Sequence, residues 1–179
     1  MSALESLSEL SHPLVYLAGY PEQILNAVKS RIQNRTLKDY LLQKYPQVNL
    51  IRSDKQLFEF VKELKNQAMK KESQLAKVHY DAHMKDLKGV LGTQTRITRM
   101  HGSKTKSKNE IKISTVFKEG PAEFLNMICA HELAHLREKD HNKAFYQLCT
   151  YMEPDYFMLE LDTRIYLTYI EFFEGGLYD

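Results

Sequence analysis

The sequence contains little cysteine and no long apolar run. Cys129 and Cys149 are its only cysteines among 179 residues, too few for the disulfide framework of small secreted proteins. No segment approaches the roughly twenty apolar residues of a membrane-spanning helix. Residues 1–5 lack the basic start of a secretory signal, and the residues that follow lack its apolar stretch. We therefore expect a soluble, cytoplasmic protein whose two thiols are free and buried.

Internal repeats and low-complexity linkers are also absent. Together with a hydrophobic content of 43%, this absence predicts a single domain over residues 1–179, in which residues 1–13 form a loose lead-in. The net charge is only +2, but it is unevenly distributed. Six Lys or Arg lie within residues 96–112, and seven acids lie within residues 153–179. This asymmetry predicts a basic and an acidic edge but indicates no particular partner.

Apolar spacing predicts the order of the secondary structure. Helices are expected from apolar residues three and four apart, at 21–34, 37–45, 53–71, 121–138, 141 or 142 to 151, and 159–172. Short β-branched segments are expected as strands at 77–80, 93–100 and 110–117. The last two strands should pair as a hairpin. The order predicts an α+β fold: N-terminal helices, a small and mostly antiparallel sheet, a helix that carries the motif below, and C-terminal helices.

The most informative motif is His-Glu-Leu-Ala-His at residues 131–135, followed by His141. His131 and His135 are four residues apart, so on a helix their imidazoles project from one face and can bind one tetrahedral metal ion. His141 can be a third ligand, which leaves a fourth position open for water, as in catalytic zinc sites. Glu132 stands at the edge of the same face, where it can take a proton from water without binding the metal.

The third ligand is less determined than the first two. His141 can return to the site only if the motif helix ends near Glu138. The alternative ligands are acids close by or on a later helix: Glu138, Asp140, Glu153 and Glu160. Metzincins have the same spacing between their last two histidines, but they carry Gly where this chain has Glu138, and no Met-turn follows here. The chain is therefore not expected to be a metzincin.

A Lys-rich segment at 102–108 joins the last two expected strands. Its backbone N–H groups and ammonium groups could hold phosphate, although the spacing of a P-loop is absent. The alternative is a solvated hairpin tip. Tyr156 or Arg164 could donate to a developing oxyanion, although Tyr156 is more simply a core residue. Three further histidines are not expected to bind metal: His79, His83 and His101.

Several segments together resemble the YgjP-like metallopeptidase domain family, which is related to the SprT and WLM groups. The resemblance rests on the metal motif with its later His-Asn-Lys-Ala-Phe-Tyr (141–146), on Arg-Met-His-Gly-Ser (99–103) followed by Ile-Lys-Ile (111–113), on Met-Glu-Pro-Asp-Tyr (152–156), and on Tyr-Leu-Ala-Gly-Tyr-Pro-Glu-Gln (16–23). Many family members have Trp before the Gly-Ser pair and Cys after it. This chain has His101 and Lys104 there, so the role of that loop can differ.

The resemblance implies a zinc hydrolase, with zinc bound by His131, His135 and His141 and with Glu132 as the acid–base residue. Its first implied function is a metallopeptidase that cleaves peptide or protein substrates with a zinc-activated water. The alternative is a nucleoside triphosphate pyrophosphatase, because the family has been associated with hydrolysis of UTP to UMP and pyrophosphate. A non-catalytic module with a structural metal is a third interpretation, which the open fourth position and Glu132 disfavour. Nucleic acid and membranes are not expected partners.

Overall fold

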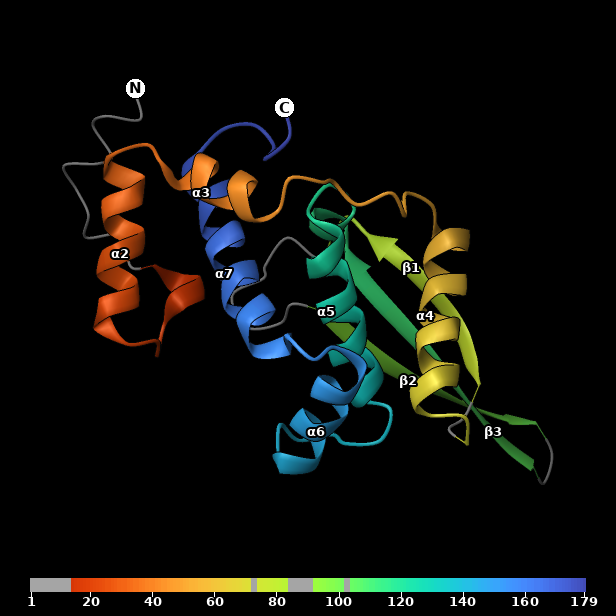
Figure 1. The fold of residues 1–179 in the computed structure, drawn as a ribbon. Coiled ribbons are helices and arrows are strands. Elements are labelled where there is room, and N and C mark those ends of the chain that lie inside the picture. The colour runs from red at the N-terminus through yellow and green to blue at the C-terminus, as the bar shows by residue number, and fades with distance from the viewer. Residues whose placement is uncertain (1–13, 72–73, 84–91, 102–103) are drawn as a thin grey trace.

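The computed structural model describes residues 14–71, 74–83, 92–101 and 104–179, and the side chains of all of these except 92–101 and 104–108 (Figure 1). The elements are η1 (Val15–Leu17), α2 (Glu22–Gln33), α3 (Leu37–Lys44), α4 (Asp54–Ala68), β1 (Leu75–Asp81), β2 (Gly92–His101), β3 (Lys104–Ser114), η2 (Thr115–Phe117), α5 (Ala122–Ala134), α6 (Lys143–Met152) and α7 (Tyr156–Phe172). The α+β class and the order of helices and strands are confirmed. The expected lead-in lies outside the described residues.

The start of α4 follows directly from the sequence. The Ser53 hydroxyl accepts a hydrogen bond from the backbone N–H of Gln56, and the Gln56 side chain accepts one from the backbone N–H of Ser53. This capping box satisfies backbone donors that have no partner within the helix. Leu57 and Val61 are buried on one face of α4, and that face packs against β1.

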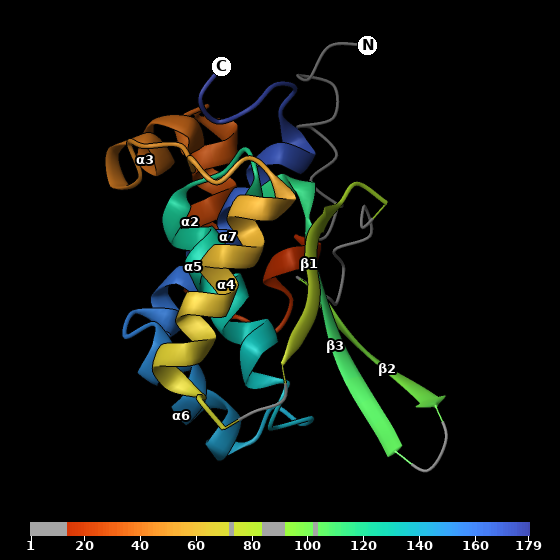
Figure 2. The same ribbon diagram turned by 90° about the vertical axis from the view of Figure 1, so that its right-hand side faces the viewer.

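The sheet has three strands in the order β1-β3-β2. The expected hairpin is confirmed, because β2 and β3 are antiparallel and pair Thr93 with Lys112. The sheet is nevertheless mixed, because β1 lies parallel to β3 and pairs Val78 with Ile111, a parallel pair that the expectation of a mostly antiparallel sheet did not include. The physical reason is that alternating apolar residues show which face of a strand is buried, but not the direction of its neighbour. A short connection follows α4 and reverses the chain, so β1 runs in the opposite direction to that helix. Strand β3 runs in the same direction as β1 (Figure 2).

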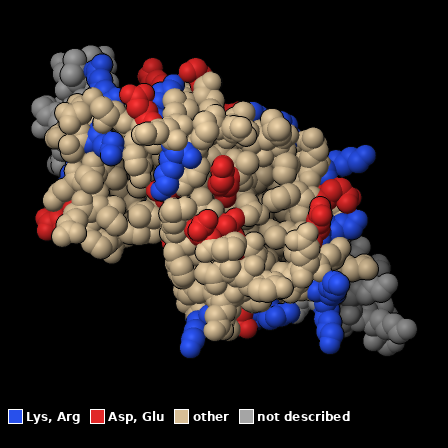
Figure 3. All heavy atoms as spheres, viewed as in Figure 1, with Lys and Arg blue, Asp and Glu red and all other residues tan. Residues whose placement is uncertain are grey.

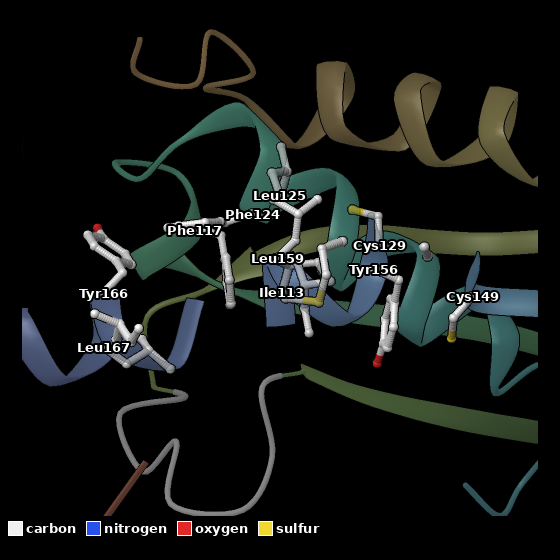
Figure 4. Close-up of a cluster of buried hydrophobic side chains, with 14 of the residues drawn as sticks. Ile113, Phe117, Phe124, Leu125, Cys129, Cys149, Tyr156, Leu159, Tyr166 and Leu167 are labelled. Carbon is white, nitrogen blue, oxygen red and sulfur yellow. The ribbon is translucent and has the colours of Figure 1, made fainter. Parts of the chain in front are cut away.

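Helix α5 lies at the centre of the molecule. The sheet and α4 lie on one side of it, and α6 and α7 lie on the other (Figures 1 and 2). Nine of its thirteen residues are buried, which explains why its sequence is apolar on nearly every face. Phe124 and Leu125 pack with Ile113, Phe117 and other core residues (Figure 4). Any polar side chain in the buried part of α5 therefore needs a partner.

The two cysteines are free and buried, as expected. Cys129 lies on α5 and Cys149 lies on α6. Among the helices in the described part of the chain, none is both long and apolar enough to cross a membrane.

Asp162 joins α3 to α7. Its carboxylate is 2% exposed and accepts hydrogen bonds from Lys44 Nζ and the Tyr45 hydroxyl, both at 2.5 Å. Burial, and then the hydrogen bond to Asp162, raise the pKa of Tyr45, so the phenol stays protonated and donates. The charge of Asp162 is thus compensated by one cation and one neutral donor.

We expect Asp162→Ala to lower the free energy of unfolding by about 1–3 kcal/mol, because it leaves the buried Tyr45 hydroxyl without its acceptor. Urea unfolding followed by circular dichroism measures this loss as a lower midpoint. Glu59→Ala is the control, since it breaks the exposed Glu59–Lys62 pair and should cost less than about 1 kcal/mol. Equal midpoints for the two variants would show that Asp162 does not hold α3 to α7.

Candidate metal centre

The structure brings His131, His135 and His141 to one point. Their Nε2 atoms are 3.2 Å apart for His131 and His135, 3.3 Å for His131 and His141, and 3.1 Å for His135 and His141. A tetrahedral zinc ion with Zn–N bonds of 2.0–2.1 Å would separate two ligand nitrogens by about 3.3–3.4 Å. Three nitrogens in this arrangement could hold one metal ion.

The end of α5 makes this convergence possible. The helix ends at Ala134, and His135 is its C-cap, four residues before the expected end at Glu138. A backbone hydrogen bond from Glu138 N to Ala134 O closes the turn. At the other end of the loop, Asn142 caps α6 by accepting from Phe145 N at 2.9 Å. The loop is therefore held at both ends, and His141 turns back toward α5.

The hydrogen bonds of the opposite ring nitrogens set the protonation of the imidazoles. His135 Nδ1 lies 3.0 Å from the carbonyl oxygen of Glu138. A carbonyl only accepts, so Nδ1 carries the hydrogen and Nε2 presents a lone pair to the shared point. His131 Nδ1 lies 2.6 Å from the Tyr156 hydroxyl. Burial, with smaller contributions from His135 and His141, lowers the pKa of His131 to about 3, so this imidazole is neutral.

Phe145 forms an apolar floor beneath the three imidazoles. Its ring centroid lies 4.9 Å from that of His131, 4.5 Å from that of His135 and 4.7 Å from that of His141. It comes from the first turn of α6, four residues after His141. The contact limits the rotation of all three rings and keeps water from their lower side. In the sequence, this contact is indicated by the spacing of His141 and Phe145. The apolar periodicity of α6 alone does not predict it.

Glu132, like His131, is a polar residue of the largely buried helix α5 and therefore needs a partner. Its side chain is 1% exposed, and its Oε2 atom has no hydrogen-bond partner within the described residues. Burial raises the pKa of Glu132 to about 8. A buried carboxyl group without partners is costly, whereas a water molecule or a cation beside it would remove that cost. The residues present therefore fit a metal ion, with a buried carboxyl group that could accept a proton on the residue next to His131.

The acids that could replace His141 as a ligand are engaged elsewhere or exposed. The Glu138 carboxylate accepts from Asn142, Glu153 accepts from Asn126 and from the backbone N–H of Asp155, and Glu160 pairs with Arg164. Asp140 is exposed. Among the described residues, the three histidines are the group of His, Cys, Asp or Glu that could hold a metal ion.

For the other histidines and the basic segment, the described residues show no contact with the three clustered histidines. His79 lies 3.6 Å from Glu110, and His83 is exposed. The side chains of His101 and of the lysines at 104–108 lie outside the described side chains, and residues 102–103 lie outside the described residues. The backbone of the β2–β3 hairpin extends beyond the body of the molecule, on the other side from α6 (Figures 1 and 2).

Tyr156, Glu160 and Arg164 are spaced four residues apart on α7, and Tyr156 contacts His131 of the candidate centre. The helix begins at Tyr156 instead of the expected 159. The Tyr156 hydroxyl points to His131 Nδ1, on the opposite side of that ring from the shared point, so it is not placed as an oxyanion donor. The charge of Arg164 contributes to the lowered pKa of His131, and its side chain is 30% exposed.

Comparisons with known proteins place the chain among hydrolases. A family model described as "YgjP-like, metallopeptidase domain" matches residues 22–161. The chain is also similar to a protein of Escherichia coli (strain K12) named "UTP pyrophosphatase", with 48% identity over 155 residues, which are 87% of this chain and 93% of that protein. No solved structure matches the chain.

We expect His131→Ala and His135→Ala to abolish metal binding and His141→Ala to weaken it strongly, because only two nitrogen ligands would remain. Metal content after dialysis against micromolar free zinc, measured by mass spectrometry, tests this. His79→Ala is the control and should retain the metal. Full zinc content in His141→Ala would exclude His141 as the third ligand.

Proposed function

The chain belongs to the YgjP-like metallopeptidase family and is a hydrolase, and from this premise we propose that it is a zinc-dependent nucleoside triphosphate pyrophosphatase. Its proposed reaction splits UTP into UMP and pyrophosphate. The observation that supports a hydrolytic function is the convergence of three imidazole nitrogens on one point, with an unpartnered, buried carboxyl oxygen on Glu132, the residue next to His131. The name of the E. coli relative, which is similar over nearly the whole of both chains, favours a nucleotide over a peptide.

In the proposed reaction, His131, His135 and His141 hold the zinc ion. A zinc ion held there would polarise the scissile group and lower the pKa of a water molecule at the open position. Glu132 accepts the proton of the attacking water as the new phosphorus–oxygen bond forms, and the bond from the α-phosphorus to the bridging oxygen breaks. A raised pKa makes Glu132 a stronger base, and general bases act best when their pKa is near the working pH.

A triphosphate needs positive charge near the metal centre, and Arg164 is a described cation whose charge acts on His131. Its Nε and Nη2 contact Glu160 at 2.8 and 2.7 Å, and its Nη1 donates to the Tyr16 carbonyl at 3.2 Å. Within the described residues, these contacts use three of the five guanidinium N–H groups. The other two are free to bind a phosphate oxygen, while Glu160 fixes the orientation of the guanidinium.

Peptide-bond hydrolysis is the second candidate function. The family model is described as a metallopeptidase, and the same zinc and Glu132 chemistry serves an amide carbonyl. A peptide substrate could add to an edge of the sheet, and β1 and β2 are the two edges. A purely structural metal is disfavoured by the partnerless Glu132 oxygen. On the face shown in Figure 3 the described Lys and Arg side chains are scattered and form no stripe, so this face gives no support for nucleic acid as a partner.

We expect Glu132→Gln to keep the metal and to lower turnover by a factor of about 10² to 10⁴, because the amide cannot accept a proton. The zinc-loaded wild type and variant are each incubated with a panel of nucleoside triphosphates and with a denatured protein mixture. Pyrophosphate release by the wild type alone supports the proposal. Peptide cleavage by the wild type without pyrophosphate release would establish the peptidase instead, and full activity of the variant would exclude Glu132 as the base.

We expect Arg164→Gln to raise KM for UTP by about tenfold or more, because a charged hydrogen bond to phosphate is lost. The increase should be larger at low salt, where charges are less screened. Arg164→Lys is the matched control: it keeps the charge and should recover part of the affinity. Thermal melting of both variants checks that they are folded. An unchanged KM in a folded Arg164→Gln protein would remove Arg164 from the substrate site.

A further inference from the structure

We propose that Tyr156 is a positioning residue for the metal centre: its hydroxyl accepts the Nδ1 hydrogen of His131 and thereby fixes that imidazole with Nε2 toward the metal. The inference rests on the metal site of the proposed function. Tyr156 is 1% exposed, and its hydroxyl lies 2.6 Å from His131 Nδ1. The two rings are nearly parallel, with centroids 6.2 Å apart. The two residues are 25 positions apart in the chain, and all of α6 lies between them.

The direction of this hydrogen bond follows from the other side of the ring. His131 Nε2 lies within 3.3 Å of two other imidazole nitrogens, so as a ligand it must present a lone pair. The hydrogen of the neutral ring is then on Nδ1, and the Tyr156 oxygen accepts it. The hydroxyl directs its own proton to the buried Cys149 thiol, with which it forms a side-chain hydrogen bond.

The position of Tyr156 is itself fixed to the helix that carries His131. Tyr156 N donates to Glu153 O at 3.0 Å, and the Glu153 carboxylate accepts from the backbone N–H of Asp155 and from the side chain of Asn126. Asn126 lies on α5, five residues before His131. The turn between α6 and α7 is therefore attached to α5 close to the ring that Tyr156 contacts.

Among the three proposed ligands, His131 is the one whose Nδ1, the ring nitrogen farther from the proposed metal position, contacts a side chain distant in sequence. The far nitrogen of His135 meets the backbone carbonyl of Glu138, which no substitution of a side chain removes. His141 is exposed. Removal of the Tyr156 hydroxyl therefore tests the orientation of one ligand alone.

A neutral partner also bears on the substrate. Metal-bound histidines often donate to carboxylates, which add negative charge behind the ligand. Here the phenol hydroxyl of Tyr156 takes the place of such a carboxylate behind His131. A divalent ion bound there would keep more of its charge, which favours an anionic substrate such as a phosphate chain over a neutral amide.

The test compares Tyr156→Phe with Tyr166→Phe. Both residues are buried tyrosines of α7, and the Tyr166 hydroxyl donates to the Val116 carbonyl at 3.4 Å, away from the metal centre. Zinc affinity is measured by competition with a chromophoric chelator. We expect Tyr156→Phe to bind zinc about 10- to 100-fold more weakly, and Tyr166→Phe to bind it like the wild type. Cobalt-loaded Tyr156→Phe should also show an altered visible absorption spectrum, because one ligand ring is less constrained.

The outcomes separate this inference from the function on which it rests. A wild type that binds no zinc overturns the metal site. A wild type that binds zinc, with equal affinity and an identical cobalt spectrum for Tyr156→Phe, overturns the positioning role alone. Equal losses in both tyrosine variants would also overturn it, because they would show a general effect of stability. Melting temperatures of the metal-free proteins provide the comparison.

Discussion

The candidate metal centre depends on one constraint: α5 must carry two imidazoles on one face and then end at once. His131 and His135 lie one helical turn apart, and the helix ends between Ala134 and His135. If it continued by another turn, His141 would be carried away along the helix axis instead of returning to within 3.3 Å of the other two rings. The loop cannot move freely, because Asn142 closes it by capping α6. The position of α6, and with it the contact of Phe145 with all three rings, follows from the same helix end.

The placement of this helix in the core determines the chemistry of its polar residues. Nine residues of α5 are buried, Glu132 among them. Burial alone raises the pKa of Glu132 to about 8 and dominates the fall of the His131 pKa to about 3. Such a helix would be more stable with apolar side chains at both positions, since uncompensated polar groups cost free energy in the interior. The imidazole nitrogens face a shared point where a cation would satisfy them, and the unpartnered Glu132 oxygen could likewise be satisfied by a water molecule or a cation.

The sequence predicts those parts of the structure that depend on local spacing. The i, i+4 relation of His131 and His135 and the capping box of α4 are local, so their structural placement is as expected. The end of α5 is displaced by four residues, because no Gly or Pro marks it and the cap is His135 itself. The direction of β1 relative to β3 has no local signal. The contact between Tyr156 and His131 has none either: it joins residues on different helices, and a tyrosine with apolar neighbours is ordinarily a core residue.

A single hydrolytic centre is compatible with both the metallopeptidase description of the family and the nucleotide named for the E. coli relative. Activation of water by a metal and a carboxylate does not depend on whether the electrophile is a carbonyl carbon or a phosphorus atom. The choice of substrate therefore depends on what surrounds the centre. One face of α7 contributes to it through Tyr156, which contacts His131, and through the partly exposed guanidinium of Arg164, which Glu160 orients. Neither feature supplies the extended backbone contacts of a peptide site, whereas the guanidinium could bind a phosphate oxygen.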